Sequence, residues 1–350
     1  MTSNPLIIPI FLPNLGCRER CLFCNQRAAA EGLPSPSSVR NFIEASLVAI
    51  PHHNKNREKQ VAFYGGSFTA IHRDDQVRYL KEVQPFLASG LIGSIRVSTR
   101  PDALDAETLS LLKEYGVKTV ELGVQSMIDE VLTLANRGHC AEDTEEAVFR
   151  LKSGNFGIGL QLMIGLPGDT CGRFLQTLDQ VMELKPDFVR IHPTLVLKRA
   201  PLEILWRNGR FFPLSLEEAV QWLKKGILRL ENSSIPVARI GLQPTRELQR
   251  DLLAGPYHPA LRQLVDSAIF FDMATSLLQD SQRNGHVLFS CHPKEISNLR
   301  GQKNENILKL KKHFNLGEIS IDGKQELPRG CLGLRTQGEE VSIHRKSLVF

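Results

Sequence analysis

The feature that most constrains the fold is an alternation of short β-rich runs with amphipathic helical patterns between residues 6 and 193. Repeated β-then-α units of this length predict parallel strands joined by right-handed crossovers. A closed barrel of this kind needs about eight units, and this stretch supplies fewer, so we expect an α/β fold with an open or partial barrel. The expected strands are 6–11, 60–64, 94–98, 119–123, 159–164 and 188–192, and the expected helices are 73–87, 105–114, 142–152 and 170–184.

A second, smaller unit is expected at the C-terminal end of the chain. After Pro193 the pattern becomes largely helical, and the polar stretch Ser-Gln-Arg-Asn-Gly at 281–285 has the composition of a linker. The sequence therefore predicts a barrel domain with a helical extension over 1–281 and a small basic α+β domain over 285–350. In the small domain we expect a strand at 287–290, helices at 293–299 and 305–314, and a strand at 318–321.

The composition narrows the class of protein. With 42% hydrophobic and 23% charged residues, the chain has the composition of an ordinary soluble globular protein. No apolar run is long enough to span a membrane, and the first residues lack the basic region and cleavage site of a signal peptide. Seven unevenly placed cysteines do not form the framework of a disulfide scaffold. We therefore expect a cytoplasmic protein.

The positive charge is concentrated near the C-terminus. The chain carries a net charge of +5, and residues 282–350 hold twelve Lys or Arg against seven Asp or Glu, which accounts for all of it. Such a balance is common on a solvated protein surface, and it also suits contact with a polyanion. Charge alone leaves both interpretations open.

The strongest functional signal is a cysteine triad on the loop that follows the first expected strand. The sequence Gly16-Cys17-Arg-Glu-Arg-Cys21-Leu-Phe23-Cys24 has the spacing Cys-x3-Cys-x2-Cys. Three thiolates on one short loop can bind three irons of a 4Fe-4S cluster and leave the fourth iron open. An open iron can chelate S-adenosylmethionine and pass an electron into its sulfonium, which releases a 5′-deoxyadenosyl radical, and the cofactor itself supplies this chemistry.

Two other interpretations of the triad are weaker. A zinc site would need a fourth ligand and would more often show paired Cys-x2-Cys units. Incidental core cysteines would not be spaced this way in a loop that contains Arg and Glu. The remaining cysteines are isolated, and we expect them to act as small buried apolar residues; they are Cys140, Cys171, Cys291 and Cys331.

Downstream motifs carry a family resemblance. With the triad, they resemble the radical S-adenosylmethionine superfamily and, within it, the radical domain of the catalytic subunit of Elongator, the tRNA wobble-uridine modifying complex. The likeness covers about residues 6–270 and implies a partial (β/α)6 TIM-type barrel with the cluster at the C-terminal strand ends. The motifs are Thr99-Arg-Pro-Asp102, Val120-Glu-Leu-Gly-Val-Gln-Ser126, Asn136-Arg-Gly-His139 and Pro193-Thr-Leu-Val196.

The chain also departs from the Elongator pattern. Its first two cysteines are closer together, Ser98 stands where that family usually has Glu, and His192 replaces a tyrosine. No part of the sequence resembles an acetyl-coenzyme A site or the C-terminal acetyltransferase domain of that subunit. Carboxymethyl transfer from acetyl-coenzyme A is therefore not implied.

The resemblance implies contacts to S-adenosylmethionine at four places. Small residues after the second strand would contact the amino group of its methionine, because they let backbone approach a ligand closely. The next two strand ends would line the ribose and carboxylate, and the fifth would lie against the adenine. A structural turn or core strand is the alternative at each place. These residues are Gly65, Gly66, Ser67 and Phe68, then Thr99, Arg100 and Gln125, then Met163, Gly165 and Pro167.

Three charged or titratable residues are further candidates at the barrel mouth. Lys198 follows the sixth strand and could meet an anionic substrate or a cofactor carboxylate as a catalytic residue; a solvated surface lysine is the alternative. Arg137 and His139 lie in a motif of the family, and we expect them to brace a loop or cap a helix rather than act in catalysis.

The small domain contains a candidate RNA-binding loop. The sequence Gly301-Gln-Lys-Asn304 lies between two expected helices and resembles the loop of a K-homology fold, in which a Gly-x-x-Gly sequence clamps the nucleic-acid backbone. Asn304 replaces the second glycine, and Asn tolerates a left-handed conformation better than most residues. The alternative is a scaffold domain with a solvated helix face. The RNA-binding candidates are Gly301, Lys303, Asn304, Lys309 and Lys312, with Lys311 adding to the attraction for phosphates.

Three functions remain open on the sequence alone. The first is a radical enzyme that modifies RNA, most directly tRNA. The second is a radical enzyme for a small molecule, in the manner of oxygen-independent porphyrinogen oxidases. The third is a non-catalytic, metal-stabilised adaptor. Either enzyme would need an electron donor such as flavodoxin or ferredoxin.

Overall fold

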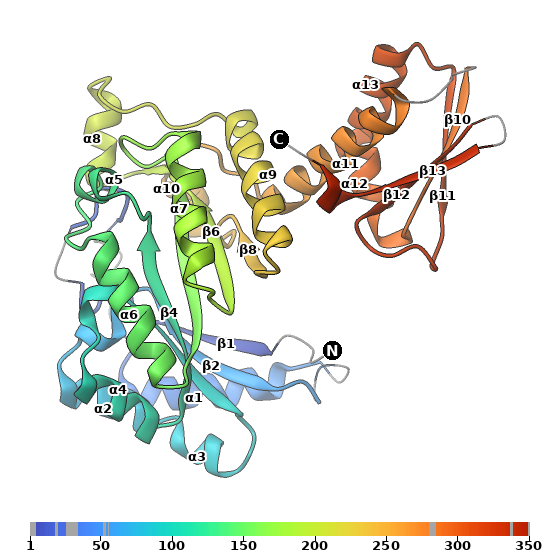
Figure 1. Ribbon diagram of the computed structural model, residues 1–350. Helices are drawn as coiled ribbons and strands as arrows, with labels where there is room; N and C mark the ends of the chain where they lie inside the picture. Colours follow the sequence, from blue (N-terminus) through green and yellow to red (C-terminus); the bar gives the residue numbers. More distant parts are fainter. Residues whose placement is uncertain are drawn as a thin grey trace. The chain divides into compact units, whose positions relative to one another are not determined.

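The computed structural model describes residues 5–17, 20–25, 34–51, 54, 56–279, 285–336 and 339–348. The chain divides into two compact units (Figure 1), the first comprising 1–213 with 245–255 and the second comprising 214–244 with 256–350. From the sequence we expect residues 214–244 and 256–281 in the barrel domain; by their contacts, residues 214–244 and 256–279 group with the second unit.

The first unit is built on parallel strands that follow one another in chain order. Each strand pairs with the next, so the sheet grows in one direction and curls without closing. The expected α/β partial barrel is confirmed. The six strands are β1 (Leu6–Phe11), β2 (Lys59–Tyr64), β3 (Ser94–Thr99), β4 (Val117–Gln125), β5 (Gly157–Ile164) and β6 (Phe188–Pro193).

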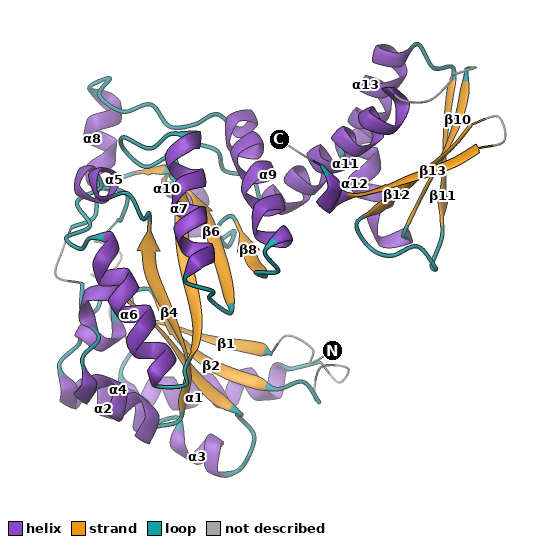
Figure 2. Cartoon of the chain, viewed as in Figure 1, coloured by secondary structure: helices purple, strands orange, loops and turns teal. Residues whose placement is uncertain are grey.

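Helices connect these strands, and α4 and α6 pack on β4 and β5 (Figure 2). The prediction of a single helix at 73–87 is wrong, because the chain forms two helices there, at 73–81 and 84–88. Pro85 cannot donate a backbone hydrogen bond and its ring clashes with the preceding turn, and it lies in the first turn of the second helix. The helices are α1 (Pro36–Ala49), α2 (Arg73–Lys81), α3 (Gln84–Ala88), α4 (Ala106–Glu114), α5 (Asp129–Leu134), α6 (Ala141–Ser153), α7 (Cys171–Glu183), α8 (Pro201–Arg207) and α10 (Arg246–Asp251).

Three short features complete this unit. The 3-10 turns η3 (Phe68–Ala70) and η4 (Pro101–Ala103) follow β2 and β3. The short strands β7 (Val196–Leu197) and β9 (Leu252–Ala254) pair antiparallel. These features matter because the ends of the parallel strands, where the loops begin, are where this architecture places its chemistry.

A buried polar layer crosses the sheet. Glu121 on β4 is 0% exposed, and its carboxylate accepts hydrogen bonds from Arg96 at 2.8 Å, Arg190 at 3.1 Å and Tyr64 at 2.8 Å. Burial raises the pKa of Glu121, but the charges of Arg190 and Arg96 outweigh it and hold that pKa below its usual value. One carboxylate therefore ties together side chains from β2, β3 and β6.

The second unit contains a mixed four-stranded sheet in the order β11-β10-β12-β13. β10 and β11 are parallel, and the other pairs are antiparallel. The expected small α+β arrangement is confirmed, although the sequence did not predict β12 or β13. The elements are α9 (Leu216–Asn232), β8 (Val237–Ile240), α11 (Leu261–Gln279), β10 (His286–Cys291), η5 (Pro293–Glu295), α12 (Ile296–Arg300), η6 (Gln302–Asn304), α13 (Glu305–Phe314), β11 (Glu318–Gly323), β12 (Cys331–Thr336), β13 (Glu339–His344) and η7 (Arg345–Ser347).

The core of this unit lies between the sheet and α11. α11 contacts α12, α13, β12 and β13, and it contributes Phe270, which is fully buried with Phe289 of β10 and Leu334 of β12. Among the described residues, no helix is both long and apolar enough to cross a membrane.

Candidate functional site

The cysteine loop leaves β1 at the C-terminal edge of the sheet. Cys21 is buried, and Cys17 and Cys24 are half-buried. Backbone hydrogen bonds from Cys17 to Asn14 and from Cys24 to Cys21, both 3.1 Å, shape the loop into turns. The thiol of Cys24 donates to the side-chain oxygen of Asn14 at 3.2 Å. Residues 18–19, between the first two cysteines, lie outside the described residues.

The electrostatics of the triad fit a bound metal cluster. Burial is the main cause that raises the pKa of the Cys24 thiol to about 12, and the nearby Cys21 and Cys17 contribute to this increase. Thiolates here would therefore need a strong positive charge beside them, and a coordinated metal supplies one because it deprotonates the thiol outright. Within the described ranges, no three His, Cys, Asp or Glu side chains converge as the ligands of a single ion do. Each thiolate of a cubane instead binds a different iron.

The loop after β2 interlocks with the cysteine loop. The backbone NH of Ser67 donates to the carbonyl of Leu15 at 2.9 Å. A Cβ on Gly66 would lie 2.3 Å from that carbonyl oxygen, and a Cβ on Gly16 would lie 2.2 Å from the carbonyl oxygen of Ser67. Both positions therefore require glycine because backbone fills the space. The hydroxyl of Ser67 lies 3.9 Å from the sulfur of Cys17.

Replacing Gly66 with alanine is expected to destabilise the protein by about 1–3 kcal/mol, because the added methyl group would overpack against backbone that cannot move aside. The midpoint of urea unfolding measures this. Gly172→Ala is the matched control, since the nearest atom to a Cβ there is 3.9 Å away. Equal midpoints for the two variants would contradict the proposed interlock.

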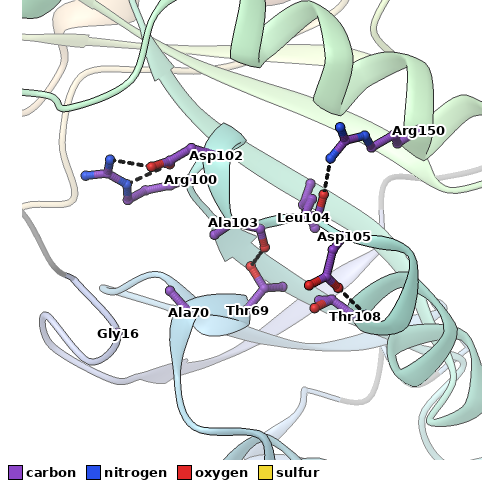
Figure 3. Close-up of a pocket in the computed structure, with 10 residues that line it drawn as sticks. All are labelled: Gly16, Thr69, Ala70, Arg100, Asp102, Ala103, Leu104, Asp105, Thr108 and Arg150. Atoms are coloured by element: carbon purple, nitrogen blue, oxygen red, sulfur yellow. Dashed lines mark hydrogen bonds and ion pairs between the residues drawn. The ribbon is translucent and has the colours of Figure 1, made fainter.

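The loop after β3 borders a pocket of about 330 Å³ (Figure 3). Arg100 is buried and donates two hydrogen bonds to Asp102, at 2.8 and 2.7 Å. The hydroxyl of Thr99 is buried and lies 2.6 Å from that of Thr69. The pocket therefore joins the loops after β1, β2 and β3. Its lining residues are Gly16, Thr69, Ala70, Arg100, Asp102, Ala103, Leu104, Asp105, Thr108 and Arg150.

The ends of β4 and β5 complete the set of expected cofactor contacts. Gln125 ends β4 with φ of 71°, a conformation that is uncommon for a residue other than glycine. Met163 packs in an apolar cluster with Ala135 and Leu166, against which Phe23 of the cysteine loop lies. The end of β5 therefore packs against the cysteine loop, through Met163 and Phe23.

The loop after β5 is fixed by one carboxylate. Gly165 has φ of 73°, and its NH donates to Asp169 at 2.9 Å. Pro167 beside it is half-buried. Burial raises the pKa of Asp169 to about 6.

Two of the expected site residues point to other roles. Phe68 is buried, with its ring centroid 5.0 Å from that of Phe63, so its side chain belongs to the core. Lys198 is exposed, and its ammonium donates to the carbonyl of Arg250 at 2.9 Å. Of the expected catalytic and cofactor-binding residues, Arg100 alone is among those that line the pocket.

The candidate RNA-binding loop lies in the second unit, between α12 and α13. Gly301, Lys303 and Asn304 have φ of 70°, 51° and 62°. The expectation that Asn304 adopts a left-handed conformation in place of glycine is confirmed. Lys303, Lys309 and Lys312 are exposed, and Lys309 pairs with Glu305.

Two further side chains hold the cysteine loop, and of these the sequence led us to expect a bracing role for Arg137 but not for Asn136. Asn136 donates from its side-chain nitrogen to the carbonyl of Arg20 at 2.9 Å, and Arg137 donates to the sulfur of Cys21 at 3.1 Å. The Asn136-Arg-Gly-His139 motif was the available signal, and the bracing role expected for Arg137 agrees with this contact. Asn14 gave no signal at all.

Comparison with known families identifies the family of the chain. The family model described as Radical SAM superfamily matches residues 12–181, and the Radical_SAM C-terminal domain matches residues 186–270. The chain belongs to the radical S-adenosylmethionine superfamily. It is an enzyme of this class, and the first of the two matches contains all three cysteines of the triad.

Relatives with assigned names resemble parts of this radical S-adenosylmethionine enzyme. The tRNA uridine(34) acetyltransferase of Methanocaldococcus infernus is 34% identical over 128 residues, which are 36% of this chain and 24% of the relative. Protein YhcC of Escherichia coli K12 is 29% identical over 207 residues, 57% of this chain and 64% of the relative. Human Elongator complex protein 3 is 30% identical over 174 residues, 49% and 31% respectively. The chain thus spans less than two thirds of each relative.

A solved structure shares the fold. The archaeal Methanocaldococcus infernus Elp3 with an N-terminal deletion superposes with a TM-score of 0.60 at 22% identity, covering 77% of this chain and 63% of that chain. At this identity the likeness establishes the fold alone.

Proposed function

We propose that this protein is a cytoplasmic radical S-adenosylmethionine enzyme that modifies RNA, most directly tRNA. Relatives named tRNA uridine(34) acetyltransferase and Elongator complex protein 3 support an RNA substrate. A 4Fe-4S cluster held by Cys17, Cys21 and Cys24, once reduced by a donor such as flavodoxin or ferredoxin, would supply the electron that cleaves S-adenosylmethionine into a carbon radical.

The chain's own residues would bind and orient the cofactor. Gly65 and Gly66 pack against the backbone of the cysteine loop, which would hold the loop after β2 at the methionine end of the ligand, and Ser67 lies next to Cys17. Thr99, Arg100 and Gln125 would face the ribose and carboxylate. Met163, Gly165 and Pro167 would form the apolar wall against adenine, where burial keeps water away.

The observation that carries the RNA assignment is the shape of the loop between α12 and α13. Lys303 and Asn304 are both left-handed and exposed in this loop, which leads into the exposed lysines of α13. Asn306 holds it from beneath, donating to Ser267 at 2.9 Å and to the carbonyl of Asn298 at 3.2 Å. A loop that is already ordered loses little entropy when it binds a phosphate backbone.

Binding of total tRNA in a filter assay tests the assignment. Wild-type protein is expected to bind with an affinity that falls steeply as salt rises, because lysines release counterions from the RNA. Gly301→Asp is expected to weaken binding by about tenfold or more, since it sets a negative charge beside the phosphates.

The matched control is Gly90→Asp. Gly90 also has positive φ, 70°, and open space around it, but it lies in the first unit. A Cβ on Gly301 would lie 3.0 Å from Asn306, so Gly301→Asp can also change the shape of the loop. A second variant, in which Lys303 and Lys312 are both replaced by glutamate, changes the charge and leaves Gly301 in place. Equally weak binding by wild type and all variants, even at low salt, would refute an RNA substrate bound through this loop. If the protein does bind tRNA, mass spectrometry of tRNA nucleosides from cells lacking the protein would identify the modified position.

A further inference from the structure

The turn after α5 contacts three consecutive residues of the cysteine loop. The carbonyl of Ala135 accepts from the NH of Leu22 at 3.1 Å. Asn136 and Arg137 then reach Arg20 and Cys21 through their side chains. The turn therefore fixes both the backbone of the loop around its central cysteine and the environment of that sulfur.

Arg137 is built into this position rather than lying on the surface. It is 6% exposed, and its backbone NH donates to the carbonyl of Leu132 at 3.0 Å. One terminal nitrogen donates to the carbonyl of Gly123 at 2.5 Å, and the other donates to the sulfur of Cys21. The guanidinium cannot swing away without losing both contacts.

The positively charged guanidinium of Arg137 lies beside the sulfur of Cys21. The groups that its terminal nitrogens contact are a carbonyl and a thiol, neither of which is a carboxylate, and its Nε is buried without a partner among the described residues. A buried cation without a counter-anion is costly. The thiolate that Cys21 would present to a cluster is an anion in the right place.

We propose that Arg137 is a positioning residue that raises the reduction potential of the cluster through a charge-assisted hydrogen bond to Cys21. The inference rests on the proposed function for the presence of the cluster. Hydrogen bonds to cluster sulfurs and the local charge set such potentials. The reduced cluster carries one more negative charge than the oxidised one, so a fixed cation beside its sulfur favours the reduced state.

An EPR-monitored redox titration of anaerobically reconstituted protein tests this inference. Arg137→Met is expected to lower the ratio of reduced to oxidised cluster at a fixed potential by about tenfold, which is a shift of about 59 mV for one electron. Arg137→Lys, which keeps the charge, is expected to recover part of the shift. Arg78→Met is the control, since Arg78 is an exposed residue of α2 paired with Asp75.

The outcomes separate this inference from the proposed function. If wild-type protein holds no cluster, the proposed function fails. If Arg137→Met holds its full iron and titrates at the wild-type potential, only the role of Arg137 is overturned. If Arg137→Met loses the cluster, Arg137→Lys is compared with Arg137→Gln, which keeps a donor without charge: a higher potential for Lys supports the inference, and equal potentials overturn it.

Discussion

Replacing Cys21 with alanine is expected to lower the affinity for the iron–sulfur cluster by more than about 100-fold, because even residues behind metal ligands contribute 10–100-fold. Reductive cleavage of S-adenosylmethionine should then be undetectable. Iron and sulfide analysis after anaerobic reconstitution measures the first effect, and the yield of 5′-deoxyadenosine measures the second. Cys17→Ala and Cys24→Ala should behave in the same way, because each thiolate binds a different iron.

Cys171→Ala is the matched control for this loss. Cys171 is half-buried like Cys17 and Cys24 and forms no disulfide, but it begins α7 and lies outside the cysteine loop. Its variant should reconstitute like wild type, and circular dichroism should show that every variant keeps its fold. A full complement of iron in Cys21→Ala would remove the basis for the proposed cluster.

Replacing Glu121 with glutamine is expected to destabilise the first unit by about 3–5 kcal/mol, because the change leaves the buried Arg96 and the half-buried Arg190 without their counter-charge. Arg96 and Arg190 both donate to this carboxylate, which is 0% exposed. The free energy of urea unfolding, followed in the protein without cluster, measures the loss.

The same substitution at an exposed ion pair provides the comparison. Glu107 lies 2.7 Å from Arg73 with 80% of its side chain exposed, so Glu107→Gln should change the unfolding free energy by about 1 kcal/mol or less. If Glu121→Gln were as mild as Glu107→Gln, the polar layer would not hold the strands together.

The sequence was a good guide to the parallel sheet. Strands such as 60–64 and 159–164 are mostly apolar runs, and parallel strands buried on both faces require that pattern. The helix expected at 73–87 was wrong because its periodicity runs through Pro85, which splits it. The hairpin of β12 (Cys331–Thr336) and β13 (Glu339–His344) was missed, although residues 340–344 alternate between polar and apolar as an exposed strand does.

The candidate site was predictable only where its residues are close in sequence. The spacing of Cys17, Cys21 and Cys24 predicts a ligand set from neighbouring residues alone. The contact between Arg137 and Cys21 spans 116 positions, and it exists because consecutive parallel strands bring their following loops to one edge. Lys198 is exposed directly after β7, which pairs with β9. No local sequence pattern predicts this pairing between segments far apart in the chain.

The mutual packing of Gly16 and Gly66 has a consequence for how this protein can change. Each glycine faces a backbone carbonyl of the other loop, at 2.2 and 2.3 Å from where a Cβ would stand. Substitutions in the two loops should therefore be strongly non-additive, since a shift that accommodates one side chain displaces the segment carrying the other. The two loops are therefore expected to accumulate substitutions together, because the backbone of each loop limits which residues the other can accept.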